Sequence, residues 1–481
     1  FESDPFNVRV SNMRKVLRHL EKYETKETEH YRIRFDPKND KALAAYLAEF
    51  LEAVYDDLSK QFQHKPKGKI LVEVFNNHEM FSGRTIALPD LHTIGACTGR
   101  MVAMVSPHGR GVRKPFNWGR VMRHEIVHIF NLDQTNFLLP HWFTEGLAVL
   151  NEGFPRPQIW NQLLKDRVPK GKILNLDTID LGFMRPRDQF EWNMAYCQSL
   201  LYIQYMKKKY GDKVIGEMLD AFRDGLGAVA AIAKVCKTKK EDFEKGYREF
   251  LNEVVKSIKG KTEEKQLSFA KLKKMYTDDP TNPDVMAQLA ERYLDRNRNK
   301  ARELADEALQ RKRGHPLASY VRARLYIVAG ESKRAFDLLV RAVDKENPET
   351  KVLKLLGKMY YDSRQFPKAA EIFELGRKAE PYENYWLIQL AKVYALAEDT
   401  EKQIEILQAL VPTDADDFDN RKRLTRILLS EKKYVEAEKY ARQALEIDIR
   451  NDTVRDYLYK ALEGQGKNDE ANRMRKLLGD S

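Results

Sequence analysis

Cysteine is scarce in this 481-residue chain, and its three residues, Cys97, Cys197 and Cys236, are odd in number and widely spaced. That spacing excludes a disulfide framework and a zinc site built on paired cysteines. We therefore expect the three thiols to be small, reduced packing residues. No uninterrupted apolar run approaches the roughly 18–20 residues that cross a membrane, so no membrane span is predicted.

The chain also lacks a methionine at its start, because residue 1 is Phe1. We expect a processed chain or one excised from a longer protein, and the compartment stays open between the cytoplasm and export after removal of a signal sequence. The 42% apolar and 10% aromatic composition predicts a folded, soluble protein. The length is too great for one ordinary core and indicates about three folded units.

The chain lacks a long segment that carries charges of one sign only, although its net charge is +12. Basic and acidic residues are mixed in both halves of the chain. The densest basic part, residues 61–123, has no glycine–aromatic interleaving and no known nucleic-acid fold signature. A solvated surface, or a basic rim beside a cleft that favours acidic substrates, explains the charge as well. No nucleic-acid partner is predicted; the alternative would show steeply salt-dependent binding to DNA or RNA.

The most informative stretch that is present is His124-Glu125-Ile126-Val127-His128. On an α-helix, positions i and i+4 lie on the same face, so His124 and His128 can bring two imidazoles onto one Zn²⁺. Glu125 lies further round the helix, where it can reach a metal-bound water without being a ligand. That is the general-base position of HExxH metalloproteases. The alternative is an ordinary amphipathic helix with two surface or core histidines.

The flanks of this motif predict a largely buried helix over residues 118–130. Asn117 is a favourable N-cap, and apolar residues wrap most of the helix. Unpaired histidines in such a helix are costly unless something satisfies them, and a metal ion would do so. Neither Asn131 nor Gln134 supplies the glycine and third histidine of the metzincin extension, so the sequence argues against that subclass.

A third ligand is expected downstream of His128, in the segment His141–Ala148, and Glu145 is the favoured residue. A loop between the two segments lets a second helix return antiparallel to the first. Gly146 and Ala148 are small enough to let the two backbones approach closely. This arrangement places Glu145 opposite the two histidines.

We therefore expect one Zn²⁺ per chain, held by His124, His128 and Glu145. His141 and Glu152 lie on roughly the same helix face as Glu145 and are rival ligands. The plain alternative for both rivals is that they are solvated residues.

The sequence HEIVH at 124–128, followed by PHWFTEGLAVLNEG at 140–153, resembles the gluzincin branch of zinc peptidases, and specifically the peptidase MA-like domains. The resemblance covers about residues 29–258. It implies an α+β zincin-like domain, a small mixed sheet plus helices that carry HExxH. The elements that match are strands at 31–35, 69–76 and 100–106 and helices at 41–62, 118–130 and 193–209.

This resemblance also implies a catalytic role for Tyr196. Gluzincins commonly place a Tyr or His over the reacting carbonyl from the helical half that follows the third ligand, and Tyr196 is the matching residue. The plain alternative is that Tyr196 packs in the core, as Tyr202 and Tyr205 nearby are expected to do. The implied activity is hydrolysis of a peptide or protein substrate in the zinc cleft, with Glu125 as general base. The strand around Met101–Val105 is expected at the sheet edge, where an extended substrate can pair with it.

The last 220 residues show an internal period of 34. Small residues recur at this spacing in a first ladder: Ala301, Ala335, Ala369, Ala437 and Ala471, with Gln403 in the remaining slot. A second ladder follows seven residues later: Ala308, Ala342, Gly376, Leu410, Ala444 and Leu478. Small residues at fixed places let paired helices touch. The pattern resembles a tetratricopeptide array of about six helix pairs, an all-α superhelix that follows the zincin-like domain.

The predicted organisation has four parts. Residues 1–28 form an N-terminal helical lead-in, 29–260 the peptidase MA-like gluzincin domain, 261–282 a linking or capping helix, and 283–481 the tetratricopeptide repeats. Because the ladders stop before residue 283 and a repeat array contacts chiefly its own neighbours, we expect residues 1–260 to fold without the repeats.

The function predicted from these parts is a zinc metallopeptidase whose repeat array recruits a protein partner or substrate. The alternative is a catalytically inactive peptidase-like scaffold in which the repeats carry the interaction. The intact Glu125 favours the enzyme, since a scaffold has no evident need for an acid beside the first histidine.

Overall fold

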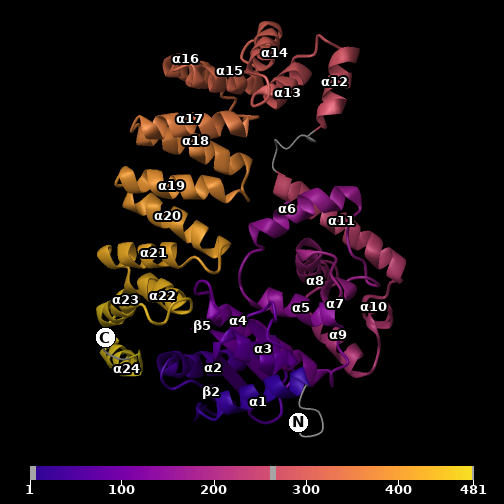
Figure 1. The fold of residues 1–481 in the computed structure, drawn as a ribbon, viewed down its shortest axis with the longest axis vertical. Coiled ribbons are helices and arrows are strands. Elements are labelled where there is room, and N and C mark those ends of the chain that lie inside the picture. The colour runs from indigo at the N-terminus through magenta and orange to yellow at the C-terminus, as the bar shows by residue number, and fades with distance from the viewer. Residues whose placement is uncertain (1–6, 260–266, 479–481) are drawn as a thin grey trace. The chain divides into compact units, whose positions relative to one another are not determined.

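The computed structural model describes residues 7–259 and 267–478. It divides into two compact units, one made of Phe1–Asn252 together with Val411–Ser481, and the other of Glu253–Leu410. Figure 1 labels the helices of both units and, among the strands, β2 and β5. The boundary expected near Gly260 lies outside the described residues, and the predicted domain limits remain predictions.

A five-stranded mixed sheet forms the N-terminal part of the first unit. Its strands, in spatial order, are β1 (Glu24–Glu27), β2 (Tyr31–Phe35), β3 (Ile70–Asn77), β5 (Met101–Arg110) and β4 (Gly95–Cys97). β2, β3 and β5 run parallel, and β1 and β4 pair antiparallel at the two edges. The predicted small mixed sheet is therefore confirmed.

The expectation that Met101–Val105 forms the edge of this sheet is wrong. β4 covers that side of β5, with Ala96 opposite Ala103. A tight turn between the two strands returns the chain: the N–H of Thr98 donates to the carbonyl oxygen of Met101 at 2.9 Å, and Gly99 takes a φ of +84°. Glycine adopts this left-handed conformation without steric cost. On this side of the sheet, the edge strand is β4.

Eleven described helices belong to the N-terminal part. They are α1 (Val8–Leu20), α2 (Lys41–Phe62), α3 (His78–Ile86), α4 (Trp118–Gln134), α5 (His141–Asn151), α6 (Gln158–Arg167), α7 (Leu181–Met184), α8 (Gln189–Tyr210), α9 (Val214–Arg223), α10 (Ala228–Cys236) and α11 (Lys240–Lys259). α2, α3 and α4 pack against the sheet, and α4 carries the HExxH segment. α2 packs against both β2 and α4. No helix in the described ranges combines the length and apolar character needed to span a membrane.

Gly146 on α5 has a different neighbour from the one expected. A Cβ on this residue would lie 2.5 Å from the carbonyl oxygen of Ser199 and 2.7 Å from Cγ1 of Ile203, both on α8. The glycine therefore allows α5 to lie close against α8. Its predicted use as a spacer between α4 and α5 is wrong, although α4 and α5 do pack together.

After α12 (Phe269–Asp278), twelve described helices follow in six pairs. They are α13 (Pro283–Tyr293), α14 (Arg298–Arg311), α15 (Pro316–Val328), α16 (Ser332–Arg341), α17 (Thr350–Asp362), α18 (Phe366–Ala379), α19 (Asn384–Leu396), α20 (Thr400–Leu410), α21 (Phe418–Ser430), α22 (Tyr434–Leu445), α23 (Asp452–Gly464) and α24 (Asn468–Leu478). The helices within each pair pack against each other. The predicted all-α repeat region is confirmed.

Both ladders lie on the packed faces of these helices. Every residue of the first ladder is buried. In the second ladder, a Cβ added at Gly376 would lie 2.4 Å from the ring of Trp386. The side chain of Leu478, the last residue of that ladder, lies outside the described part. Small residues recur because these helices touch at those positions.

The last two pairs, α21–α24, belong to the same compact unit as the sheet. Several polar contacts join the two parts. Among them, Nε2 of His108 lies 2.8 Å from Oδ1 of Asp448, Nη1 of Arg473 lies 3.0 Å from Oε1 of Glu49, and Arg450 donates to the carbonyl oxygen of Asn39 at 2.6 Å. α24 also packs against α2. Helices α21–α24 therefore pack on the N-terminal part, and the expectation that residues 1–260 fold without the repeats stays a prediction.

Candidate metal centre

The helix α4 positions three of the five predicted site residues. Its N-cap is Asn117, whose side chain accepts from the N–H of Arg120 at 2.7 Å, and it continues to Gln134, four residues beyond the predicted end. His128 and Glu125 are buried and His124 is nearly so. The helix is therefore as buried as its apolar flanks predict.

α5 brings the fourth residue, Glu145, which is also buried. The helix begins after Pro140, and the N–H of Trp142 in its first turn donates to Oδ1 of Asp180 at 2.9 Å. A carboxylate satisfies one of the free N–H groups at a helix start and is favoured there by the helix dipole. This contact holds the start of α5 beside the segment that leads into α7.

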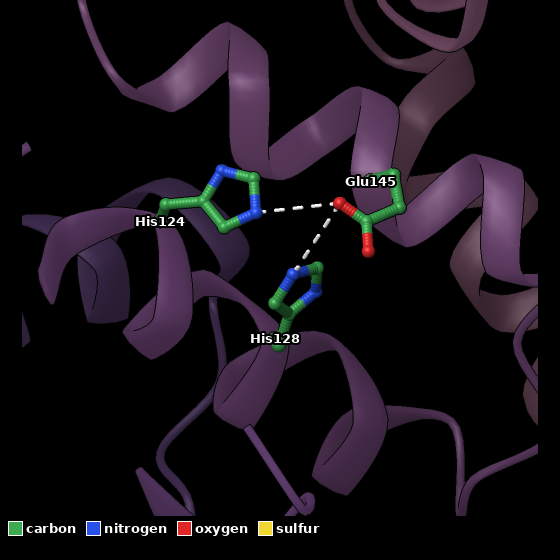
Figure 2. Close-up of side chains that lie close together, drawn as sticks. All are labelled: His124, His128 and Glu145. Carbon is green, nitrogen blue, oxygen red and sulfur yellow. Dashed lines mark ion pairs between the residues drawn. The ribbon is translucent and has the colours of Figure 1, made fainter. Parts of the chain in front are cut away.

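The structure brings His124, His128 and Glu145 to one point (Figure 2). Oε2 of Glu145 lies 3.3 Å from Nε2 of His124 and 3.7 Å from Nε2 of His128. One potential ligand atom from each residue lies within 4.8 Å of the others. Two ligands on a tetrahedral zinc ion with bonds of about 2.0–2.1 Å are separated by roughly 3.4 Å. The spacing of the three atoms therefore suits such an ion.

Oε2 of Glu145 is the atom that tests this fit. It is buried, and it has no hydrogen-bond partner among the described residues. A buried carboxylate oxygen without a partner is expensive, whereas a metal cation would satisfy it together with both imidazole nitrogens. The donor set of two histidines and one carboxylate is that of a catalytic zinc site.

Each histidine is oriented through its other ring nitrogen. Nδ1 of His124 lies 2.8 Å from Oε1 of Glu152, and Nδ1 of His128 lies 2.7 Å from Oγ1 of Thr144. With the proton on Nδ1, Nε2 of each ring keeps its lone pair toward Glu145. Arg120 in turn donates to Oε2 of Glu152 at 3.0 Å.

These contacts decide where the two rival ligands lie. Glu152 faces the outer nitrogen of His124, on the side away from Glu145. His141 is half-exposed, and its Nε2 lies 3.0 Å from Oε1 of Glu145, the oxygen that does not face the two histidines. Both rivals therefore contact the ligand set without joining it.

Burial and neighbouring charges shift the pKa values of the three clustered residues in different directions. Burial lowers the pKa of His128 to about 4, so the ring is neutral at pH 7, as a metal ligand must be. Burial opposes ionisation of Glu145, but His128, His124 and His141 outweigh it and hold the pKa of Glu145 well below its usual range. For His124, burial is outweighed by the nearby carboxylates of Glu145 and Glu152, which raise its pKa; a cation bound at Nε2 would take the place of that proton.

Glu125 differs from each of the three clustered residues in the direction or the cause of its pKa shift. Burial raises the pKa of its carboxyl to about 7; His124 opposes this rise, and the charges of Glu145 and Glu152 add to it. A carboxyl with a pKa near neutrality both accepts and releases a proton readily at pH 7. A bound cation would favour its ionised form.

Gly95 of β4 lies directly against Glu125. A Cβ on Gly95 would lie 2.8 Å from Oε1 of Glu125 and 2.7 Å from Cγ1 of Val121. Only glycine therefore lets the edge strand approach α4 at the carboxylate. Gly95 is not among the site residues predicted from the sequence, although a glycine inside a short strand often marks a close backbone approach.

Tyr196 lies on α8 between two aromatic rings. Its centroid is 4.9 Å from that of Phe183 and 4.9 Å from that of Trp192, both edge-on. Burial raises the pKa of its phenol well above the usual value, and the charges of Glu145 and Glu125 raise it further. The phenol therefore lies within the electrostatic reach of the site and stays protonated. Its catalytic role remains a prediction.

Comparison with known proteins identifies the domain that carries this site. Residues 109–253 match the family model of the Peptidase MA superfamily. They include α4, α5 and α8 and hence all five predicted site residues. No curated protein matches the chain.

Among solved structures, the chain is similar to small repeat proteins. One structure of MamA is 19% identical, over 34% of this chain and 96% of MamA, with a TM-score of 0.27. The structure titled as the functional characterization of Pseudomonas aeruginosa PilF is 18% identical, over 41% of this chain and 90% of that protein, with a TM-score of 0.27. Overlaps of this size carry no argument about function.

Proposed function

We propose that this protein is a zinc-dependent peptidase of gluzincin type in which His124, His128 and Glu145 hold one zinc ion. The single observation that carries the proposal is the buried Oε2 of Glu145, which faces Nε2 of both histidines and has no hydrogen-bond partner in the described residues. The match of residues 109–253 to the Peptidase MA superfamily supports the same ligand set.

Zinc in such a site supplies a Lewis acid and lowers the pKa of a bound water to about 7. Residues of this chain supply the other two requirements, proton transfer and orientation of the histidine ligands. Glu125 accepts a proton at a carboxylate oxygen and later delivers it to the leaving amine, a role that its pKa of about 7 suits. Glu152 and Thr144 keep the histidine rings in the tautomer that leaves Nε2 free.

The edge strand β4 is the element that we propose for substrate binding. Among the described strands it pairs on one side alone, with β5. An extended peptide that pairs with its other side gains main-chain hydrogen bonds by strand addition. Gly95 on this strand touches Glu125, so a peptide bound there would run past the general base.

Tyr196 is proposed as a hydrogen-bond donor to the oxygen of the scissile carbonyl. Its pKa is raised well above 10, so the O–H keeps its proton. A phenol that donates to a developing negative charge contributes more in the transition state than in the ground state. The repeat helices are proposed to recruit a protein partner or substrate.

The test compares the wild-type protein with Glu125→Gln. The amide keeps the shape of the carboxylate and cannot accept the proton, so peptide hydrolysis should fall by about 10²–10⁴-fold or more. Zinc content, measured by elemental analysis, should stay near one per chain in both proteins and fall in His124→Ala.

The matched control is Glu79→Gln, at an exposed position on α3, which should leave hydrolysis unchanged. Equal cleavage of a peptide library by the wild-type protein and Glu125→Gln would reject the catalytic role. If zinc is bound and no library peptide is cut by either protein, the inactive scaffold becomes the better description.

A further inference from the structure

The first helices of three successive repeats carry a basic residue at the same place. Arg324 on α15, Lys358 on α17 and Lys392 on α19 follow each other at intervals of 34 residues, the period of the repeat. The residue before each of them, Ala323, Gly357 or Ala391, is buried against a neighbouring helix. Equivalent positions in stacked repeats lie on the same face of the array. The three cations therefore form one row, which we call the basic row.

The basic row is short of partners within its own unit. Lys358 and Lys392 are exposed, and in the described residues neither makes an ion pair or a hydrogen bond. Arg324 donates to the hydroxyl of Tyr320 and has one weak ion pair, at 4.0 Å, with the exposed Asp295. Exposed cations in line, without counter-charges, raise the local concentration of anionic ligands.

Apolar side chains accompany the basic row. Ile388 and Leu396 lie one helical turn before and after Lys392 and are 40% and 51% exposed, and Val328 lies one turn after Arg324 and is 59% exposed. Residues four apart share a helix face, so these side chains border the row. Asp362, one turn after Lys358, is the acidic exception on this face. Exposed apolar groups beside cations suit a peptide better than a phosphate backbone.

The spacing of the row suits an extended chain. α15 packs against α17, and α18 packs against both α17 and α19. Packed helices lie about 8–10 Å apart, and three residues of a peptide in the polyproline II conformation span about 9 Å and complete one turn, so that every third side chain points the same way. A peptide in that conformation would therefore meet Arg324 and Lys358, on two directly packed helices, with side chains three residues apart, and would reach Lys392 further along, beyond α18.

We propose that the basic row of Arg324, Lys358 and Lys392 binds an acidic peptide segment, with acidic residues about three apart and apolar residues between them. The proposal names the partner class for the recruiting role of the repeats and rests on that role, but it does not depend on zinc or on peptide hydrolysis. At the same 34-residue interval, the next two positions after Lys392 are also basic: Arg426 and Lys460, both exposed.

The probe is a fluorescein-labelled nine-residue peptide, Leu-Glu-Ser repeated three times, whose binding to the full chain is followed by fluorescence anisotropy. Lys358→Glu combined with Lys392→Glu should weaken binding by about tenfold or more, because like charges then face each other. A second peptide with Lys in place of Glu should bind this double variant better than the wild type. The inactive Glu125→Gln protein should bind the acidic probe as the wild type does.

The matched control is Lys333→Glu combined with Lys378→Glu, at exposed positions on the second helices α16 and α18, which changes the net charge equally. It should leave binding within about twofold, and melting temperatures should confirm that both double variants are folded. Equal weakening by the two pairs, or no weakening by either, would overturn the proposal. So would binding of oligouridine as tightly as the acidic peptide, since that would identify a nucleic-acid surface.

Discussion

The indole N–H of Trp118 donates to the carbonyl oxygen of Leu445 at 3.0 Å, across 327 residues of sequence. The backbone N–H of Trp118 also donates to the carbonyl oxygen of Glu446 at 2.8 Å. Trp118 is the first residue of α4, whose initial N–H groups have no partner inside the helix. The end of α22 therefore caps the helix that carries His124, Glu125 and His128.

Removal of residues 411–481 should destabilise the metal site. Trp118 is fully buried, and the truncated protein would expose it together with the first turn of α4. We expect a lower melting temperature and a zinc content below one per chain, because metal binding and folding are coupled. Differential scanning fluorimetry and elemental analysis measure both. A truncated protein that keeps its melting temperature and full zinc would show that the metal site does not depend on residues 411–481.

The single substitution Trp118→Phe isolates the contact to Leu445. It keeps an aromatic six-membered ring, removes one buried hydrogen bond and leaves a small cavity where the pyrrole part of the indole packed, which together should lower stability by about 1–4 kcal/mol. Trp160→Phe is the matched control, because the indole of Trp160 donates to Oδ1 of Asn193 at 3.0 Å away from this contact. Both variants should lose similar stability, but only Trp118→Phe should also weaken zinc binding.

Thr144→Val should weaken zinc binding without removing a ligand. The hydroxyl of Thr144 lies 2.7 Å from Nδ1 of His128 and helps to orient that ring. Loss of such an outer partner typically costs about 10–100-fold in metal affinity. Competition with a zinc chelator measures the affinity. Thr135→Val is the control, since Thr135 is also buried but donates to the carbonyl oxygen of Asn131; equal effects of the two would assign Thr144 to general stability.

Tyr196→Phe should lower kcat by about 10²–10³-fold, the usual loss for one oxyanion donor, with KM and zinc content little changed. Steady-state kinetics on a cleaved peptide give kcat and KM. Tyr202→Phe is the control, because Tyr202 stacks on Tyr247 with centroids 3.6 Å apart, in the core. An unchanged kcat with a lower melting temperature would place Tyr196 in the core as well.

Glu446 should make stability depend on pH. Burial beside Gly119 raises the pKa of its carboxyl from 4.5 to about 7, although Arg421 opposes the rise. Below pH 4.5 the group is protonated in both the folded and the unfolded state. Between pH 4.5 and 7 only the unfolded state loses the proton, so stability falls as pH rises, by up to roughly 3 kcal/mol.

The measurement is the melting temperature at pH 5 and pH 8. Glu446→Gln has no proton to lose, so its decrease across this range should be smaller than that of the wild type. Glu436→Gln, at an exposed position on the same helix α22, should behave as the wild type does. A wild-type decrease that persists unchanged in Glu446→Gln would assign the pH dependence to other groups.

Local sequence signals were sufficient for several elements. β2 and α2 have the bounds that the resemblance implied, 31–35 and 41–62, and their apolar residues recur with the period of a strand and of a helix. The alignment of His124 with His128 also follows from helix geometry alone. Glu145 required one further inference, that α5 returns against α4, and the two helices do pack together.

Other features depend on residues that are far apart in the sequence and come into contact only in the tertiary structure. No periodicity indicates that β4 covers β5, that Gly95 touches Glu125, or that Glu152 contacts Nδ1 of His124. Nor does the 34-residue period show that its last two pairs group with the sheet in one compact unit, since the same small residues serve helix packing in every repeat. The sequence by itself therefore determined the helices, the repeat and the residues to be considered as ligands, which depend on short-range patterns. The sheet edge, the orientation of the ligands and the cap on α4 were decided by long-range contacts, because these depend on which surfaces meet when the whole chain folds.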